Sequence, residues 1–299
     1  MMHNPIFASS IKRRMRSFHS PLIITLYGVF LLLVSMGALS TLYASGWTLG
    51  NLRAGIETYI YLSVMQFTLI VLVAPALTAG SIAGERERQT LDLLLCTRMG
   101  ALRIVVGKLL SSLVFLLLLV VSSLPMMGIV LLFGGVTIGQ VLRMLLLLSV
   151  TALACASIGI FCSAFFKRTV TATVVAYLTV FALGAGTLIV PFLLQQAQIV
   201  AITESTSVSW TAWALFVRMP KLFYFNPALG LLSLIVEQTG IMNRTFSTMG
   251  MGMWRLYSIF TQAGSTAWIN MAVLTLCVAV LTPLAALGIK PMGRKARKR

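Results

Sequence analysis

The chain consists of long apolar runs separated by short charged or glycine-containing breaks. A bilayer core about 30 Å thick needs about 20 apolar residues per helix, and several runs reach that length. The simplest partition gives six membrane-spanning helices, so the predicted fold class is all-α and polytopic. The predicted spans are 22–44, 59–79, 102–133, 141–166, 171–194 and 268–288.

The composition supports this partition. Hydrophobic residues make up 59% of the 299 residues, charged residues make up only 10%, and the mean hydropathy is +0.97. Such values are not typical of a soluble core of this size. We therefore treat residues 1–299 as a single transmembrane domain.

Lysine and arginine are distributed unevenly over the predicted loops. With the N-terminus in the cytoplasm, 17 of the 23 basic residues fall on the cytoplasmic side. The positive-inside rule therefore favours two cytoplasmic termini, with 289–299 as a basic cytoplasmic tail. A seventh span over 222–236 would send this tail outward, so we interpret that stretch as interfacial or re-entrant.

The formal net charge of +17 also has a membrane explanation. Lysine and arginine next to the spans attract anionic lipid head groups. Nucleic-acid binding would need aromatic platforms among basic residues on a soluble domain, and the basic run 294–299 has no aromatic residue. We expect membrane lipid as a partner and no nucleic acid.

Segment 1–21 has the pattern of an amphipathic elbow helix that enters the membrane at Ser20-Pro21. The residues of its apolar face are Phe7, Ile11, Met15 and Phe18. The basic residues of the opposite face are Lys12, Arg13 and Arg16. A cleaved secretory signal is disfavoured because the run 22–44 is longer than a usual signal core, whereas a disordered basic leader stays an open alternative.

Catalytic and metal sites lack the necessary residues. The only histidines, His3 and His19, precede the first span, so a membrane-embedded hydrolase has no base there. Cys155 and Cys162 share a helix face, but no histidine or carboxylate accompanies them in a predicted span. We expect no enzymatic activity, no metal and no cofactor in this chain.

The positions of the six acidic residues separate two classes of transporter. An ion-coupled carrier usually keeps an ionisable group at membrane depth. None of the six is predicted there: they are Glu57, Glu85, Glu87, Asp92, Glu204 and Glu237. A stand-alone secondary transporter is therefore the weaker alternative, and the energy for transport would come from a partner.

A charged stretch, 84–98, lies between the second and third spans. In a helix from Glu85 to Leu95, Arg88 and Asp92 are four apart and can pair beside an apolar patch. Such a helix suits a groove on a partner protein, whereas a helix on the lipid surface would be poorer in acid. The residues predicted to dock are Glu85, Arg86, Glu87, Arg88, Thr90, Leu91, Asp92, Leu94 and Leu95.

The run from Gly84-Glu85-Arg86-Glu87-Arg88 to Leu95, followed by Arg103 and Gly107-Lys108, resembles the cytoplasmic loop of exporter-type ABC transporter permeases. These are transmembrane subunits of the type-2 ABC membrane-subunit family. Gln89 stands where that family commonly has glycine, and Arg98 where proline is common. A second patch, 157–169, resembles the fourth span of the family and its short basic turn.

The resemblance covers about residues 60–190 and implies a subunit that dimerises, binds two cytoplasmic ATPase subunits and exports an unidentified substrate. ATP and magnesium would belong to the partner ATPase, and 84–98 would be the coupling helix. The second permease subunit would be identical or homologous. The implied location is a bacterial cytoplasmic (inner) membrane. An alternative is a permease of this type that moves no free solute and relays force within an assembly.

Two features stay open between a structural and a functional interpretation. The small pairs Gly159/Ser163 and Ala182/Gly186 favour close helix approach, either within the chain or at a subunit interface. The long outer loop 195–265 carries a cluster of aromatic residues, which suits an aromatic belt at the outer membrane surface or a lid over an exit path.

Overall fold

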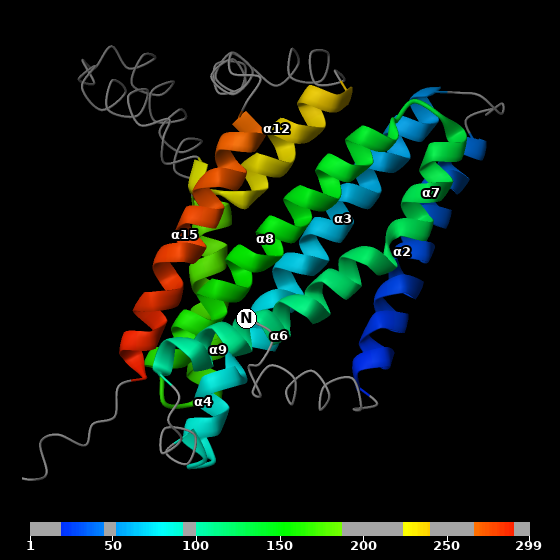
Figure 1. The fold of residues 1–299 in the computed structure, drawn as a ribbon. Coiled ribbons are helices and arrows are strands. Elements are labelled where there is room, and N and C mark those ends of the chain that lie inside the picture. The colour runs from blue at the N-terminus through cyan, green and yellow to red at the C-terminus, as the bar shows by residue number, and fades with distance from the viewer. Residues whose placement is uncertain (1–18, 45–51, 92–99, 187–223, 240–265, 290–299) are drawn as a thin grey trace, which may run out of the picture. The chain divides into compact units, whose positions relative to one another are not determined.

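The computed structural model describes residues 19–44, 52–91, 100–186, 224–239 and 266–289 (Figure 1). Every regular element in these ranges is helical, which confirms the predicted all-α polytopic class. The elements are α2 (His19–Ala44), α3 (Leu52–Thr78), α4 (Gly80–Glu87), α6 (Ala101–Ser122), α7 (Leu124–Phe133), α8 (Ile138–Phe165), α9 (Thr169–Phe181), the π-helix η1 (Ala182–Gly186), α12 (Pro227–Thr239) and α15 (Thr266–Gly288).

Five helical segments of the described chain are long and apolar enough to cross a membrane. They are Gly55–Glu87, Ala101–Leu132, Ile138–Phe165, Thr169–Gly186 and Thr266–Gly288, and they correspond to the second to sixth predicted spans. The first predicted span, 22–44, coincides with α2, whose apolar part is the shorter Pro21–Gly37.

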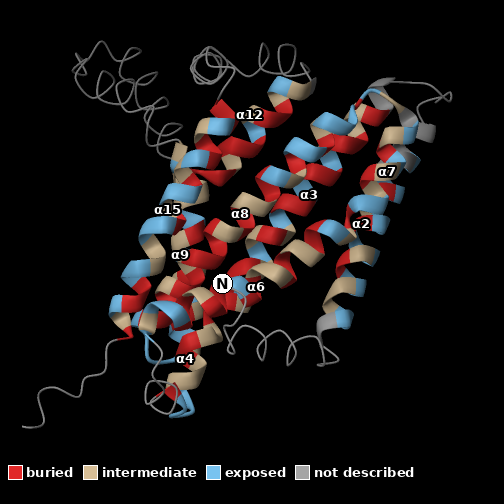
Figure 2. Ribbon diagram, viewed as in Figure 1, coloured by how far each residue is buried: buried red, intermediate tan, exposed pale blue. Residues whose placement is uncertain are grey.

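The chain forms two compact units. The first consists of Met1–Tyr177 and Thr275–Arg299, and the second of Leu178–Leu274. Packing in the first unit centres on α3, which lies against α8 and also contacts α2, α6 and α7. Buried residues follow the helices of this unit in stripes (Figure 2). Along α3 the stripe is Tyr59, Leu62, Gln66, Ile70 and Ala74, a spacing of three or four residues that places all five on one face.

The outward faces of the helices are as apolar as the interior. Large hydrophobic side chains are exposed along α2, α8 and α9, for example Leu26, Leu33, Leu142 and Val170. In a soluble protein this much exposed apolar surface would be unfavourable, whereas lipid tails solvate it. The surface therefore fits the predicted bilayer environment.

The third predicted span is interrupted. Ser123 separates α6 from α7, and Pro125 lies in the first turn of α7. The buried Gln66 of α3 donates from Nε2 to Ser123 Oγ, and Ser123 Oγ donates to the Val120 carbonyl. These side chains satisfy polar groups where the proline removes a backbone donor.

The second unit is held by two buried asparagines. Asn270 of α15 donates from Nδ2 to the carbonyls of Tyr224 and Asn226, at 2.8 and 3.0 Å, and Asn226 donates to the Gly184 carbonyl of η1 at 2.9 Å. They fix α12, which has 13 residues and is about 20 Å long. This is shorter than the bilayer core, in agreement with the interpretation of 222–236 as a stretch that does not span.

Candidate functional site

The candidate site is α4 and the turn that follows it. Hydrogen bonding shifts at the end of α3, where the Ala79 N–H binds the Pro75 carbonyl at 2.8 Å and a new helix begins. The first amides of a helix have no partner inside it. Here Ser163 Oγ of α8 accepts from the N–H groups of Ile82 and Ala83, both at 2.9 Å. A side chain of α8 therefore caps α4.

A second contact brings the same two segments together. Gly159 of α8 lies so close to Thr78 and Ala79 that a Cβ at position 159 would collide with Thr78 Oγ1 and lie 3.3 Å from the Ala79 nitrogen. Close approach of this kind needs a residue without a side chain. Gly159 and Ser163 are thus both used in packing within this chain. Of the other small pair, Ala182 is exposed and Gly186 half-buried in η1.

Glu85 of α4 forms an ion pair with Lys108 of α6. The Lys108 Nζ lies 2.6 Å from Glu85 Oε1 and also donates to the Ser81 carbonyl. The Lys108 side chain is only 8% exposed and the Glu85 side chain 29% exposed. An ion pair shielded from water on one side holds its geometry more tightly than a surface pair.

Arg86 contacts the end of α15. Its Nη2 donates to the Gly288 carbonyl at 3.2 Å. A Cβ at position 288 would lie 3.2 Å from the Ala164 carbonyl oxygen, so α15 also approaches the end of α8 closely here. A cation at the C-terminal end of a helix satisfies a carbonyl that has no partner within the helix and interacts favourably with the helix dipole.

Glu87 contacts the start of α9. Its Oε2 accepts from Thr169 Oγ1 at 2.8 Å and from the Thr169 N–H at 3.4 Å. A carboxylate at a helix N-terminus is stabilised by the free amides and the positive end of the dipole. Glu85, Arg86 and Glu87, hereafter the charged triad, therefore bind three different helices: α6, α15 and α9.

The predicted helix over Glu85–Leu95 is wrong in its continuity. The helix ends at Glu87, and Gln89 has a φ of 57°. The Gln89 N–H binds the Arg86 carbonyl, and the Thr90 N–H binds the Glu85 carbonyl at 2.9 Å. This pair of bonds around a left-handed residue is a Schellman motif, which terminates a helix. The stretch 84–98 is accordingly not a single helix.

The left-handed position explains the departure from the resembled family. Glycine adopts positive φ without steric strain, which suits the position where that family commonly has it. Gln89 is the one non-glycine residue with positive φ among the described residues. Arg88, Gln89 and Thr90, hereafter the docking turn, are all exposed, and Leu91 after them is buried.

We predict that Gln89→Gly stabilises the protein. Removing the side chain relieves about 1–2 kcal/mol of left-handed strain, partly offset by the greater freedom of glycine in the unfolded chain. The thermal unfolding midpoint of the detergent-solubilised protein should rise by about 1–2 °C. Arg88→Gly is the matched control, because Arg88 has an ordinary φ of −84° and glycine there should lower the midpoint. A fall with both variants would contradict the strained turn.

Several predicted residues lie outside the described ranges. These are Asp92, Leu94 and Leu95 of the docking stretch, the elbow residues 7–18, the basic tail from 290 onward and most of the outer loop. The expected pairing of Arg88 with Asp92 therefore stays a prediction. Among the described residues no group of three or more His, Cys, Asp or Glu gathers to hold a metal ion.

Sequence reasoning missed the partners of the triad. Lys108 was readable as a lone charge inside the predicted span 102–133, where an ionisable residue usually has a partner. Ser163 and Thr169 are common residue types, and Gly288 contributes only a backbone carbonyl, so the sequence carries no signal for their roles. The missed contacts give the triad its function inside the chain.

Comparison with known proteins places this helical chain in a family. Residues 48–287 match the family described as ABC-2 family transporter protein. No curated protein matches the chain significantly. Because the family match covers most of the sequence, the chain belongs to the ABC-2 family of transporter proteins, as a multi-pass permease subunit of the kind that associates with ABC ATPase subunits.

Proposed function

We propose that this protein is the permease subunit of an ATP-driven exporter, working as a dimer with an identical or homologous permease and two cytoplasmic ATPase subunits. ATP and magnesium bind to the ATPase subunits, and this chain contributes mechanical coupling without covalent chemistry. Family membership supports the assignment. The observation that carries the coupling role is the charged triad.

The triad can distribute a force applied to α4. Three successive side chains of one short helix hold α6 through Lys108, α15 through Gly288 and α9 through Thr169. Ser163 holds the opposite end of α4 on α8. A displacement of α4 therefore moves the ends of four spans together. Such a displacement, driven by closure of the ATPase subunits, would switch the spans between inward-open and outward-open states.

Contact with the ATPase falls to the docking turn. The triad side chains are already used within the chain, whereas Arg88, Gln89 and Thr90 are exposed just after them. A partner seated on this turn would push α4 along its axis. The docking stretch predicted from the sequence thus divides into an internal part that transmits force and an external part that receives it.

The arrangement of charges supports a cytoplasmic position for the docking turn. Glu87 contacts Thr169, so the turn between α8 and α9 lies at the same end as α4. That turn exposes Lys167 and Arg168, and Arg103 is exposed in the first turn of α6. A concentration of basic residues marks the cytoplasmic side. We therefore propose cytoplasmic termini and, from the resemblance, a bacterial inner membrane.

Affinity capture of the tagged permease from its native membrane tests the assignment. The wild-type chain should recover an ABC ATPase subunit. Arg88→Glu should lower the recovery several-fold, because it reverses a charge on the docking turn. Glu85→Gln should leave recovery unchanged but lower the transport-coupled ATPase rate of the purified complex, because it removes the charge that holds α6.

Arg143→Glu is the matched control for charge reversal. Arg143 is an exposed arginine on α8, 20 residues or about 30 Å from Ser163 along the helix. Its replacement should leave ATPase recovery at the wild-type level. Equal recovery with Arg88→Glu would move the contact away from the docking turn. Absence of any ATPase with the wild-type chain would reject the proposed function.

A further inference from the structure

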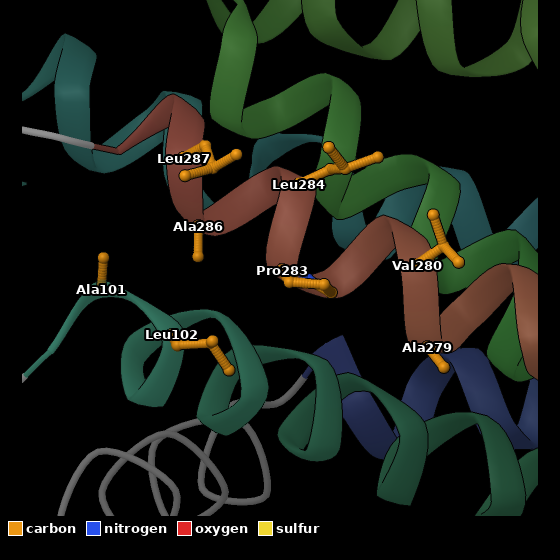
Figure 3. Close-up of a pocket in the computed structure, with 8 residues that line it drawn as sticks. All are labelled: Ala101, Leu102, Ala279, Val280, Pro283, Leu284, Ala286 and Leu287. Carbon is orange, nitrogen blue, oxygen red and sulfur yellow. The ribbon is translucent and has the colours of Figure 1, made fainter.

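An apolar groove of about 610 Å³ lies between the first turn of α6 and the end of α15 (Figure 3). Ala101 and Leu102 line it from α6, and Ala279, Pro283 and Ala286 are among the residues that line it from α15. The volume lies within the range of about 300–1,000 Å³ that is usual for small-molecule sites. Small side chains leave this space open where two helices approach.

The chemistry of the groove selects a hydrocarbon. Every lining side chain is alanine, valine, leucine or proline, so a polar ligand would find no hydrogen-bonding side chain. Leucines at the rim are half-exposed, with 51% exposure for Leu102 and 54% for Leu287. In a membrane protein such a groove opens to the lipid, and an extended acyl chain would cover these side chains.

Positive charge lies next to the same groove. Arg103 follows Leu102 on α6 and is exposed. On the other side, α15 ends at Gly288, and the sequence from 290 to 299 carries six lysine and arginine residues. A basic cluster at the membrane surface attracts anionic head groups, each basic residue adding to the attraction. The hydrocarbon and the charge together describe one kind of ligand.

We propose that the groove binds an acyl chain of an anionic phospholipid, with its phosphate against Arg103 and the basic residues that follow α15. The lipid would also influence coupling, a consequence that rests on the proposed function. The helices on either side are two that the charged triad holds, α6 through Lys108 and α15 through Gly288. Filling the groove fixes their separation and thereby keeps α4 in the position that the ATPase engages.

Photolabelling of the permease alone tests the binding site. The purified chain is placed in phosphatidylcholine vesicles with a phosphatidylglycerol that carries a photoactivatable group in its acyl chain, and labelled peptides are mapped by mass spectrometry. Labelling should concentrate at the start of α6 and the end of α15. Ala279→Trp, which fills the groove from an exposed position, should lower this labelling about fivefold, as expected when a lipid chain loses most of its apolar contact.

Leu276→Trp is the matched control. Leu276 is on the same helix, is 64% exposed and does not line the groove, so its replacement should leave the labelling unchanged. Unlabelled phosphatidylglycerol should compete about fivefold better than phosphatidylcholine, the factor expected from one basic residue at an anionic surface. Arg103→Gln should reduce that preference. The thermal unfolding midpoint of each variant verifies that it is folded.

Three results would overturn the proposal. Labelling spread evenly over all exposed apolar faces would show annular lipid only. Labelling that Ala279→Trp leaves unchanged would remove the groove as its site. Equal competition by the two lipids would remove the selection for an anionic head group. Because no ATPase is present, these results are independent of the proposed function.

The effect on coupling is measured separately, in the complex of the permease with its ATPase. Phosphatidylglycerol should raise ATP hydrolysis with the wild-type chain and with Leu276→Trp, but not with Ala279→Trp. An equal rise with Ala279→Trp would reject control of coupling through the groove.

Discussion

Replacement of Glu85 by leucine is expected to lower the free energy of unfolding by about 3 kcal/mol, the largest effect of any single change at the candidate site. The variant leaves Lys108, whose side chain is 8% exposed, as a charge without its carboxylate partner. Removing one member of a shielded ion pair is more harmful than removing both, because the remaining charge has lost its solvation. Chemical unfolding of the detergent-solubilised protein measures the change.

The reverse replacement should be milder. In Lys108→Met the remaining Glu85 side chain is 29% exposed, so water can reach it, and we expect a loss of about 1–2 kcal/mol. The double variant should lie within about 1 kcal/mol of wild type, since two apolar side chains of similar size replace the pair. Additive losses in the double variant would show that the two residues do not interact.

Gly159→Val is expected to lower the stability by about 1–3 kcal/mol through overpacking. The added side chain would collide with Thr78 Oγ1 and lie against the Ala79 backbone. The backbone cannot rotate away as a side chain can, so α3 and α4 must shift relative to α8. The thermal unfolding midpoint of the solubilised protein measures the loss. Coupling should fall as well, because the same shift displaces α4 from Ser163.

Gly139→Val is the control on the same helix. No other atom lies within 4 Å of a Cβ built at Gly139, so valine there should change the midpoint little. Combining Gly159→Ala with Thr78→Ala should recover part of the stability lost in Gly159→Ala alone, because the closest atom is then gone. Equal effects of valine at 139 and 159 would contradict the close approach of α8 to α3.

The helical framework was largely predictable because membrane spans depend on a property that the sequence displays directly. Long apolar runs set the extent of α8 and α15 to within a few residues. The break at Ser123 was not predicted, since Leu124 and Pro125 continue an apolar run and a proline within a span does not fix where the helix changes direction. The start of α8 at Ile138 follows from the Thr137–Gln140 capping box, a local signal that a hydropathy pattern does not contain.

The docking stretch was found by its charges but assigned the wrong shape. Glutamine at position 89 gave no sign of a helix end, because the usual signal for that turn is glycine. The roles of Glu85, Arg86 and Glu87 were also not deducible. Their partners come from α6, α15 and α9, and only the folded chain brings these helices together.

The contact between Arg86 and Gly288 has a consequence for how the protein is made. The two residues are separated by 202 positions, whereas Glu87 and Thr169 are separated by 82. Chains are synthesised from the N-terminus, so α4 leaves the ribosome long before its last partner exists. The triad is complete only when α15 has been inserted. A truncated or half-inserted chain would therefore present an incompletely anchored α4, and ATP hydrolysis would be connected to the membrane helices only in a finished permease.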